Sequence, residues 1–213
     1  DVNGDGYSDV IVGANWFDNG QSDEGAAFVY HGSAAGITTT VKAQLEGNQV
    51  LAQMGQCVNS AGDVNGDGYS DVIVGAINLG AAFIFHGSTT GINTTRQAQL
   101  ENGQSSTQMG ISVASAGDVN GDGYSDVIVG ANFFVNGQTD EGAAFLFHGS
   151  PAGIGTTIQT QLEGNLNYAN MGYSVAGAGD VNGDGYSDVI VGAYLYNNGL
   201  GGQGASFVFL GNN

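Results

Sequence analysis

Short apolar segments recur along the whole chain and are separated by Gly, Asn, Asp and Ser. They are rich in Val, Ile, Phe and Tyr, a pattern that predicts β-strands joined by turns. The continuous apolar run at residues 10–12 is typical of a strand that is covered on both faces. No stretch shows a sustained helical period together with capping residues. The pattern therefore predicts an all-β fold.

These segments belong to a repeating unit. The sequence DVNGDGYSDVIVGA occurs four times without a change, beginning at Asp1, Asp63, Asp118 and Asp180. A GAAF or GASF segment follows each copy, and a Gly-Ile segment, a QLE segment and a Met-Gly pair lie between successive copies. Four strands in about 60 residues are the size of one propeller blade, whereas a β-solenoid, the alternative, has shorter repeats. We predict one β-propeller domain of four-stranded antiparallel blades, with units at residues 1–53, 54–108, 109–170 and 171–213, and we expect the methionine of each Met-Gly pair to pack between blades.

The ends of the chain fall inside units. The first unit lacks the opening strand that Met-Gly begins in the others, and the last unit stops after its GASF strand. We therefore expect the four blades to be part of a larger propeller. A closed four-bladed ring and a dimer that pools its strands into one ring are the alternatives.

The first nine residues of each copy carry candidate metal ligands. Side-chain oxygens stand at positions 1, 3, 5 and 9 of DVNGDGYSD, and position 7 offers its backbone carbonyl. Calcium takes about six to eight hard oxygen ligands, and the two glycines permit a tight loop around one ion. We predict up to four bound Ca2+ ions. The predicted ligands are Asp1, Asn3, Asp5, Tyr7 and Asp9, then Asp63, Asn65, Asp67, Tyr69 and Asp71, then Asp118, Asn120, Asp122, Tyr124 and Asp126, and finally Asp180, Asn182, Asp184, Tyr186 and Asp188.

Three other interpretations of this loop are weaker. It is not an EF-hand, because Val12 stands where an EF-hand has a bidentate Glu and a strand follows the loop. Position 9 therefore has to supply the closing carboxylate. Turn chemistry alone also uses Asn, Asp and Gly, but it has no need for three mutually repelling carboxylates. Magnesium fits a crowded all-protein cage less well than calcium.

The charge of the chain is concentrated in these loops. The 213 residues include 20 Asp and Glu but only two basic side chains, Lys42 and Arg96, for a formal net charge of −18. This balance argues against binding nucleic acid through a basic patch. No apolar run reaches the length of a membrane-spanning helix, so we expect no direct membrane insertion. A single cysteine, Cys57, excludes an internal disulfide and a thiolate zinc site.

With these loops the unit resembles an FG-GAP repeat, the blade of the integrin α-subunit propeller and its bacterial relatives. The resemblance covers essentially the whole chain. It departs where Met-Gly replaces Phe-Gly and where Gly-Ala-Asn, as at residues 13–15, replaces Gly-Ala-Pro. It implies a calcium loop between the first two strands of each blade, a seven-bladed ring with calcium in its last four blades, and a place outside the cell or on its surface.

Two further groups of residues recur at fixed places in the unit. His31, His86 and His148 share a position that Leu210 takes in the fourth unit, so we expect a structural role. Long inserts between the second and third strands carry aromatic residues beside Asn, Gly and Gln. They either cap the core between blades or form a ligand surface on the face opposite the calcium loops. These aromatic residues are Trp16, Phe17, Phe133, Phe134, Tyr194 and Tyr196.

Catalytic signatures are missing from the sequence: it has no nucleophile elbow, no phosphate loop and no Ser-His-Asp arrangement. We therefore expect no enzyme. The expected function is a calcium-stabilised extracellular binding or adhesion module with a protein or carbohydrate ligand. The alternative is a structural subunit of a surface layer, sheath or filament that self-associates through open blade edges.

Overall fold

The structure is a computed structural model that describes residues 1–199 and 201–212. These residues form fourteen strands and no helix, which confirms the all-β prediction. The first sheet contains β1 (Val10–Ala14), β2 (Ala26–Tyr30) and β3 (Ala43–Glu46). The second contains β4 (Met54–Gly62), β5 (Asp71–Ala76), β6 (Ala81–Phe85) and β7 (Ala98–Glu101). The third contains β8 (Ser112–Gly117), β9 (Asp126–Ala131), β10 (Ala143–Phe147) and β11 (Thr160–Glu163), and the fourth contains β12 (Met171–Gly179), β13 (Asp188–Ala193) and β14 (Ala205–Phe209).

Within each sheet, strands that are consecutive in the chain pair side by side and antiparallel. Over the described residues the sheets hold three, four, four and three strands, as the repeat predicts. Each sheet is formed by strands that follow one another in the chain. This meander is the strand arrangement of a propeller blade.

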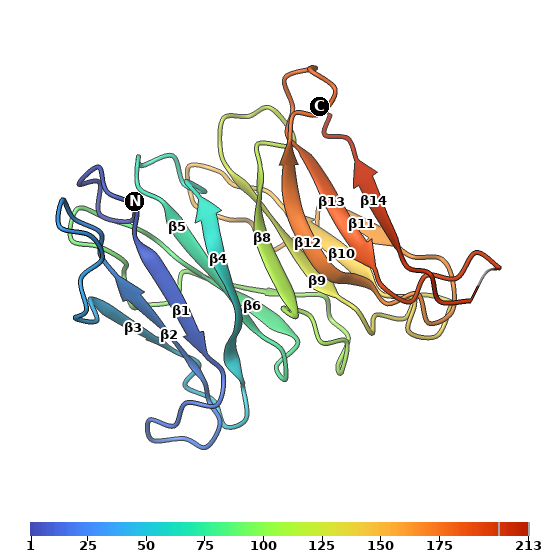
Figure 1. Ribbon diagram of the computed structural model, residues 1–213, viewed down its shortest axis with the longest axis horizontal. Coiled ribbons are helices and arrows are strands. Elements are labelled where there is room, and N and C mark those ends of the chain that lie inside the picture. The colour runs from blue at the N-terminus through green and yellow to red at the C-terminus, as the bar shows by residue number, and fades with distance from the viewer. Residues whose placement is uncertain (200, 213) are drawn as a thin grey trace.

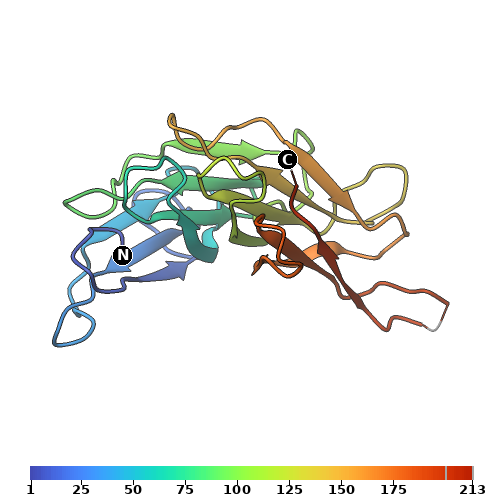
Figure 2. The same ribbon diagram turned by 90° about the horizontal axis from the view of Figure 1, so that it is seen from above.

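The sheets stack in chain order (Figure 1). Three clusters of buried apolar side chains fill the spaces between the first and second, second and third, and third and fourth sheets. The view from above places the first sheet at one end of the array and the fourth at the other (Figure 2). Over residues 1–199 and 201–212 the four sheets do not close into a ring, so the closed four-bladed ring is wrong for this structure.

The Met-Gly pair allows neighbouring sheets to approach closely. Met54 is fully buried between the first and second sheets. Gly55 has a φ of 91°, and a Cβ atom there would overlap the carbonyl oxygen of Ala26. A Cβ atom on Gly13 would in turn overlap the backbone of Gly55. Glycine is needed at both positions because backbone lies directly against backbone.

Candidate metal-binding loops

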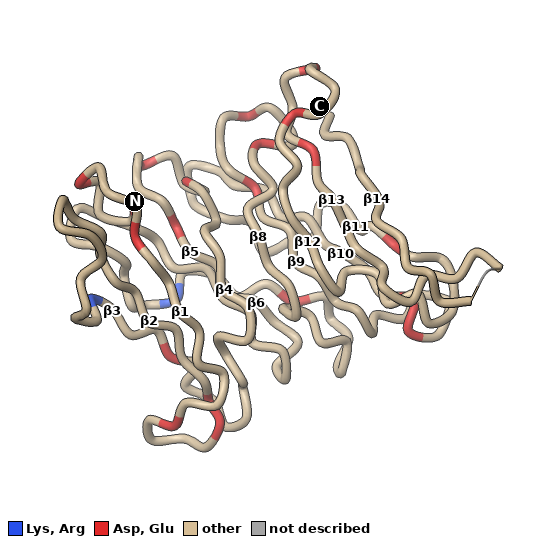
Figure 3. The backbone as a smooth tube through the Cα atoms, viewed as in Figure 1, with Lys and Arg blue, Asp and Glu red and all other residues tan. Residues whose placement is uncertain are grey.

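The four predicted metal loops lie along one edge of the stacked sheets. Those at residues 63–71, 118–126 and 180–188 join the first and second strands of their sheets, and residues 1–9 lead into β1. Figure 3 shows acidic positions along this edge and others at the opposite edge, whereas basic positions are few. Because the same sequence starts every loop, the loop of the second sheet represents the conformation of all four.

Asp63, at position 1, organises this loop. Its Oδ1 accepts the backbone N–H groups of Gly66 at 2.7 Å and Asp67 at 3.1 Å. Its Oδ2 accepts the N–H of Gly68 at 2.8 Å. Gly66 and Gly68 have φ values of 74° and 91°, which side-chain-bearing residues rarely adopt. The loop therefore wraps around one carboxylate.

Positions 3 and 5 tighten the same turn. Asn65 Oδ1 accepts the N–H of Asp67 at 3.0 Å, and Asn65 Nδ2 donates to Asp67 Oδ2 at 2.9 Å. Asp67 Oδ1 accepts the N–H of Tyr69 at 3.0 Å. The bonds within the other three loops match these to within about 0.2 Å. The repeated sequence thus builds the same local geometry four times.

The position 9 carboxylate connects the loop to a neighbouring strand. Asp71 is fully buried, and its Oδ2 accepts the N–H of Val64 at 2.9 Å while its Oδ1 accepts that of Gly87 at 2.9 Å. It therefore ties the start of the loop to the end of β6. Asp126 and Asp188 make the equivalent pairs of bonds. Each of these oxygens keeps acceptor capacity beyond its one N–H partner.

Burial and hydrogen bonding move the pKa values of these carboxyls in opposite directions. Burial raises the pKa of Asp71 to about 6, although the N–H groups of Gly87 and Val64 counteract it. Burial likewise raises the pKa of Asp126. At the exposed positions the N–H of Tyr7 and the amide of Asn3 lower the pKa of Asp5. The pKa of Asp180 is also lowered, chiefly by the hydrogen bond from the N–H of Gly185. Ionised Asp71 is thus disfavoured unless positive charge is nearby.

The recurring histidines contact position 3, which the sequence did not reveal. Nδ2 of Asn3 lies 3.2 Å from Nδ1 of His31, and the equivalent distances are 3.4 Å from Asn65 to His86 and 3.0 Å from Asn120 to His148. The amide nitrogen is held on the imidazole while the amide oxygen faces the loop. In the fourth unit Leu210 stands at this position. The signal in the sequence was the presence of His in three of the four units.

Neighbouring loops are joined by backbone contacts. The N–H of Ser70 donates to the carbonyl oxygen of Asp1 at 3.0 Å, and a Cβ atom on Gly4 would strike the ring of Tyr69. The same pair of contacts links the second loop to the third and the third to the fourth, through Ser125, Tyr124, Ser187 and Tyr186. The four loops thus form one connected row.

The donor chemistry of each loop fits calcium, since it offers carboxylate, amide and carbonyl oxygens and no nitrogen or sulfur. The carboxylates do not converge closely, however: over residues 1–199 and 201–212 no three His, Cys, Asp or Glu side chains are grouped as a metal site. Each loop is instead held by the hydrogen bonds that Asp63, or its counterpart, accepts from backbone N–H groups. The assignment of the twenty ligand residues therefore stays a prediction.

The aromatic residues of the inserts divide into two sets. Phe17, Phe134 and Tyr196 pack edge to face on Phe28 of β2, Phe145 of β10 and Phe207 of β14, with ring centroids 5.1 to 5.3 Å apart. These rings cap the core. The other three aromatic residues lie further out. Trp16 is 63% exposed and Phe133 is half-buried. Tyr194 is 48% exposed, and the centroid of its ring lies 4.5 Å from that of Tyr173. A ligand-binding role stays a prediction for the whole group.

Comparisons with known proteins bear on the repeat as a whole. A family model described as the FG-GAP repeat matches residues 1–30 and 171–209, and one described as an FG-GAP-like repeat matches residues 63–129. Together these segments make up more than half of the chain. The chain is an FG-GAP repeat protein.

Curated relatives agree with this assignment. The chain is 35% identical over 139 residues to integrin alpha-6 of Homo sapiens, a match that covers 62% of the chain and 12% of that protein. It is 33% identical over 164 residues to integrin alpha-3 of Cricetulus griseus, covering 71% of the chain and 15% of the relative. It is 30% identical to integrin alpha pat-2 of Caenorhabditis elegans over 93% of the chain and 17% of the relative. The FG-GAP chain thus spans less than a fifth of the length of these proteins, and the array of sheets is consistent with part of an integrin-like propeller.

Proposed function

We propose that this chain is a calcium-stabilised, non-catalytic adhesion-type module that works outside the cell or on its surface. The observation that carries the proposal is the fourfold repetition of one oxygen-rich loop conformation. A buried, ionisable carboxyl that no local Lys or Arg neutralises stands at position 9 in three of the four loops. Such a carboxyl is stabilised by a bound cation.

Each position of the loop would have its own role at such a site. Position 1 fixes the loop through backbone N–H groups, positions 3 and 5 present amide and carboxylate oxygens, and position 9 anchors the loop to the third strand. Bound calcium would neutralise the loop carboxylates and hold the turn closed. Because each loop donates a backbone hydrogen bond to the one before it, ordering one loop favours order in the next.

The ligand of the module is proposed to be a protein. The relatives are named as integrin alpha subunits. The insert face offers the exposed rings of Trp16, Tyr194 and Tyr173, and aromatic residues are enriched in protein-binding surfaces. With two basic residues in the whole chain, recognition there would rest on aromatic and amide groups rather than on positive charge.

Calorimetric titration of the calcium-free chain with Ca2+ tests whether the loops bind calcium. We expect four sites, weak ones being normal for extracellular modules at about 10⁻⁴–10⁻³ M. Binding to the folded state also raises the melting temperature, so a chelator should lower it markedly.

Matched variants locate the sites. Asp67→Asn keeps the acceptor for the N–H of Tyr69 but removes a carboxylate, and it should reduce the number of sites from four to three. Glu101→Gln changes an exposed carboxylate outside the loops and should leave four. No calcium uptake, or a melting temperature indifferent to the chelator, would refute the proposal.

A further inference from the structure

Eight asparagines are followed directly by glycine, and most of them fall into two groups by their place in the fold. Four stand at position 3 of the metal loops: Asn3, Asn65, Asn120 and Asn182. Three lie at the opposite edge of the sheets, in the β1–β2, β7–β8 and β9–β10 connections: Asn19, Asn102 and Asn136. The eighth, Asn198, is an intermediate case, because the N–H of Gly199 donates to the neutral amide of Asn197 at 3.0 Å. The two groups thus present the same dipeptide in different surroundings.

An Asn-Gly pair can lose ammonia without an enzyme. The backbone nitrogen of glycine gives up its proton and attacks Cγ of asparagine, so that a C–N bond forms, the bond from Cγ to Nδ2 breaks and the amide nitrogen leaves as ammonia. Water then opens the resulting succinimide ring at either carbonyl and yields aspartate or isoaspartate. Glycine favours the reaction because it has no Cβ atom to hinder the attack. The reaction requires a glycine N–H group that is free to lose its proton.

The metal loops hold this N–H group in place. In the second loop the N–H of Gly66 donates to Oδ1 of Asp63 at 2.7 Å. The equivalent bonds of the other loops measure 2.6 or 2.7 Å. Hydrogen bonds to a carboxylate are short and strong, and the negative charge of the acceptor opposes loss of the proton. The glycine nitrogen of each metal loop is therefore a poor nucleophile.

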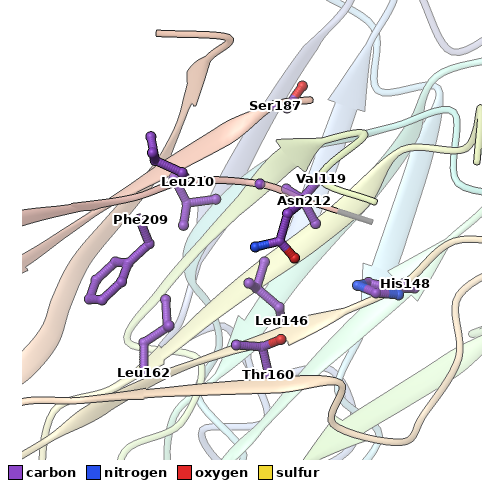
Figure 4. A pocket seen from close by; sticks show the side chains of 11 residues that line it. Val119, Leu146, His148, Thr160, Leu162, Ser187, Phe209, Leu210 and Asn212 are labelled. Carbon is purple, nitrogen blue, oxygen red and sulfur yellow. The ribbon is translucent and has the colours of Figure 1, made fainter. Parts of the chain in front are cut away.

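The amide group that would be attacked is also fixed in these loops. In the third loop Oδ1 of Asn120 accepts the N–H of Asp122 at 3.0 Å, and Nδ2 of Asn120 donates to Oδ2 of Asp122 at 2.9 Å. The same Nδ2 lies 3.0 Å from Nδ1 of His148. His148 lines a pocket between the third and fourth sheets together with Val119, the residue before Asn120 (Figure 4). The asparagine cannot turn toward the glycine nitrogen without breaking these contacts.

The pairs at the opposite edge lack this protection. Among residues 1–199 and 201–212 the N–H groups of Gly20, Gly103 and Gly137 have no hydrogen-bond acceptor. All three glycines are exposed, and no atom lies within 4 Å of the place that a Cβ atom would take. Their backbone nitrogens are therefore free to react.

Two of these asparagines hold the long inserts to the sheets. The N–H of Asn19 donates to Oε1 of the fully buried Glu24 at 2.7 Å, and its Nδ2 donates to Oε1 of Glu46 at 2.5 Å. The counterpart in the third unit makes the same two bonds, at 2.5 and 2.7 Å, to the glutamates at residues 141 and 163. Loss of ammonia replaces the donor Nδ2 by a carboxylate that faces the glutamate of β3 or β11. Because like charges repel at this distance, the product weakens the attachment of the insert.

We propose that Asn19, Asn102 and Asn136 are sites of spontaneous deamidation, and that the reaction at Asn19 and Asn136 detaches the insert of each unit from the edge of its sheet. The metal loops keep their own Asn-Gly pairs intact through the hydrogen bond to position 1. The inference rests on the hydrogen bonds of the chain itself and does not require bound calcium.

Tandem mass spectrometry of the intact chain, aged in mildly alkaline buffer with a chelator and then digested, tests the selectivity. Circular dichroism sets a temperature at which the chain stays folded. Asn19 and Asn136 should react at least about tenfold faster than Asn65 and Asn120, the order expected when one charge-assisted hydrogen bond has to break first. In urea the four sites should react at similar rates, because each is followed by glycine. Metal-loop asparagines that react as fast as Asn19 in the folded chain would overturn the proposal, and so would an unreactive Asn19 and Asn136.

Two variants that mimic the product test whether the insert is released. Asn19→Asp places a carboxylate against Glu46, whereas Asn102→Asp faces the hydroxyl of Thr107, to which Asn102 donates at 3.0 Å. The readout is amide hydrogen exchange at Leu51, whose N–H donates to a carbonyl oxygen of the first insert at 2.8 Å. Exchange there should be about tenfold faster in Asn19→Asp, because a charge-assisted hydrogen bond is lost, and unchanged in Asn102→Asp. Equal exchange rates in the two variants would overturn the release of the insert.

Discussion

β1 and β5 share the sequence VIVGA and differ in what covers them. Val12 in β1 is 47% exposed, whereas its counterpart Val74 in β5 is fully buried. β5 lies between the first and third sheets, and β1 lies at the end of the array (Figure 1). The local sequence is thus sufficient to make the strand and its pairing with the next one, but burial is decided by the neighbouring sheets.

The metal loops repeat this contrast. Asp9 and Asp71 accept the same two backbone N–H groups, at 2.7 and 2.9 Å in the first loop and at 2.9 Å for both bonds in the second. Asp71 is fully buried, but Asp9 remains half-exposed. Loops of identical sequence and internal hydrogen bonding therefore differ in the burial of the position 9 carboxylate according to their place in the array.

The largest expected effect comes from placing a charge in each of the two strands. Val74→Asp buries a carboxylate without a partner and should lower the free energy of unfolding by about 4 kcal/mol or more. Val12→Asp leaves the charge in water and should cost about 1 kcal/mol or less. Urea denaturation in calcium measures both variants. Equal losses would mean that β1 is covered in solution and that the contrast between the strands is wrong.

A pH titration of the calcium-free chain sharpens the contrast between loops. The folded-state pKa of Asp71 is raised to about 6, above the unfolded value of about 3.9. Protonation therefore favours the folded state: the cost of the ionised group is present above pH 6 and is relieved as pH falls toward 4. This one group should add roughly 2–3 kcal/mol to stability over that range.

Carbon-13 NMR of the Asp71 carboxyl, with urea denaturation at each pH, checks this expectation. The midpoint should lie near pH 6, and Asp71→Asn should remove this part of the pH dependence. A midpoint close to the unfolded value of about 3.9 would show that burial does not disfavour the charge.

An effect of intermediate size is expected at position 4 of the loops, where two glycines can be compared. Gly66 and Gly183 have nearly the same φ, 74° and 76°. A Cβ atom on Gly66 would meet the ring of Tyr124, whereas one on Gly183 meets nothing within 4 Å. Gly183→Ala should therefore cost about 1 kcal/mol of backbone strain, and Gly66→Ala about 1 kcal/mol more. Identical thermal denaturation curves for the two variants would argue against the contact between neighbouring loops.

The smallest effect is expected from the histidines. His86→Leu removes the contact with Asn65 and should weaken calcium at the second loop a few-fold, because one hydrogen bond contributes about 1 kcal/mol net. Leu210→His introduces the missing ring beside Asn182 and should strengthen the fourth loop by a similar factor. Site-resolved titration by NMR compares them. No change in either loop would assign the histidines to packing alone.

The repeat made much of this fold predictable, because strands, turns and loops follow from local sequence. The sheet order and the burial of Met54 were foreseen in this way. The contact of His31 with Asn3 and the packing of Ile92 in the core between the first and second sheets could not be predicted. Both contacts depend on three-dimensional packing and not on local sequence. Nor does sequence distinguish Trp16 from Phe17: adjacent aromatic residues differ here because Phe28 lies under one of them alone.

The most direct test of calcium binding by the repeated loops is a crystal structure of the chain grown with calcium, with the ions located by their anomalous scattering. We predict one ion in each loop. Its ligands should be oxygens of positions 1, 3, 5, 7 and 9 at about 2.3–2.6 Å. Loops without an ion at a calcium concentration well above about 10⁻³ M, or ions bound elsewhere on the chain, would contradict this prediction.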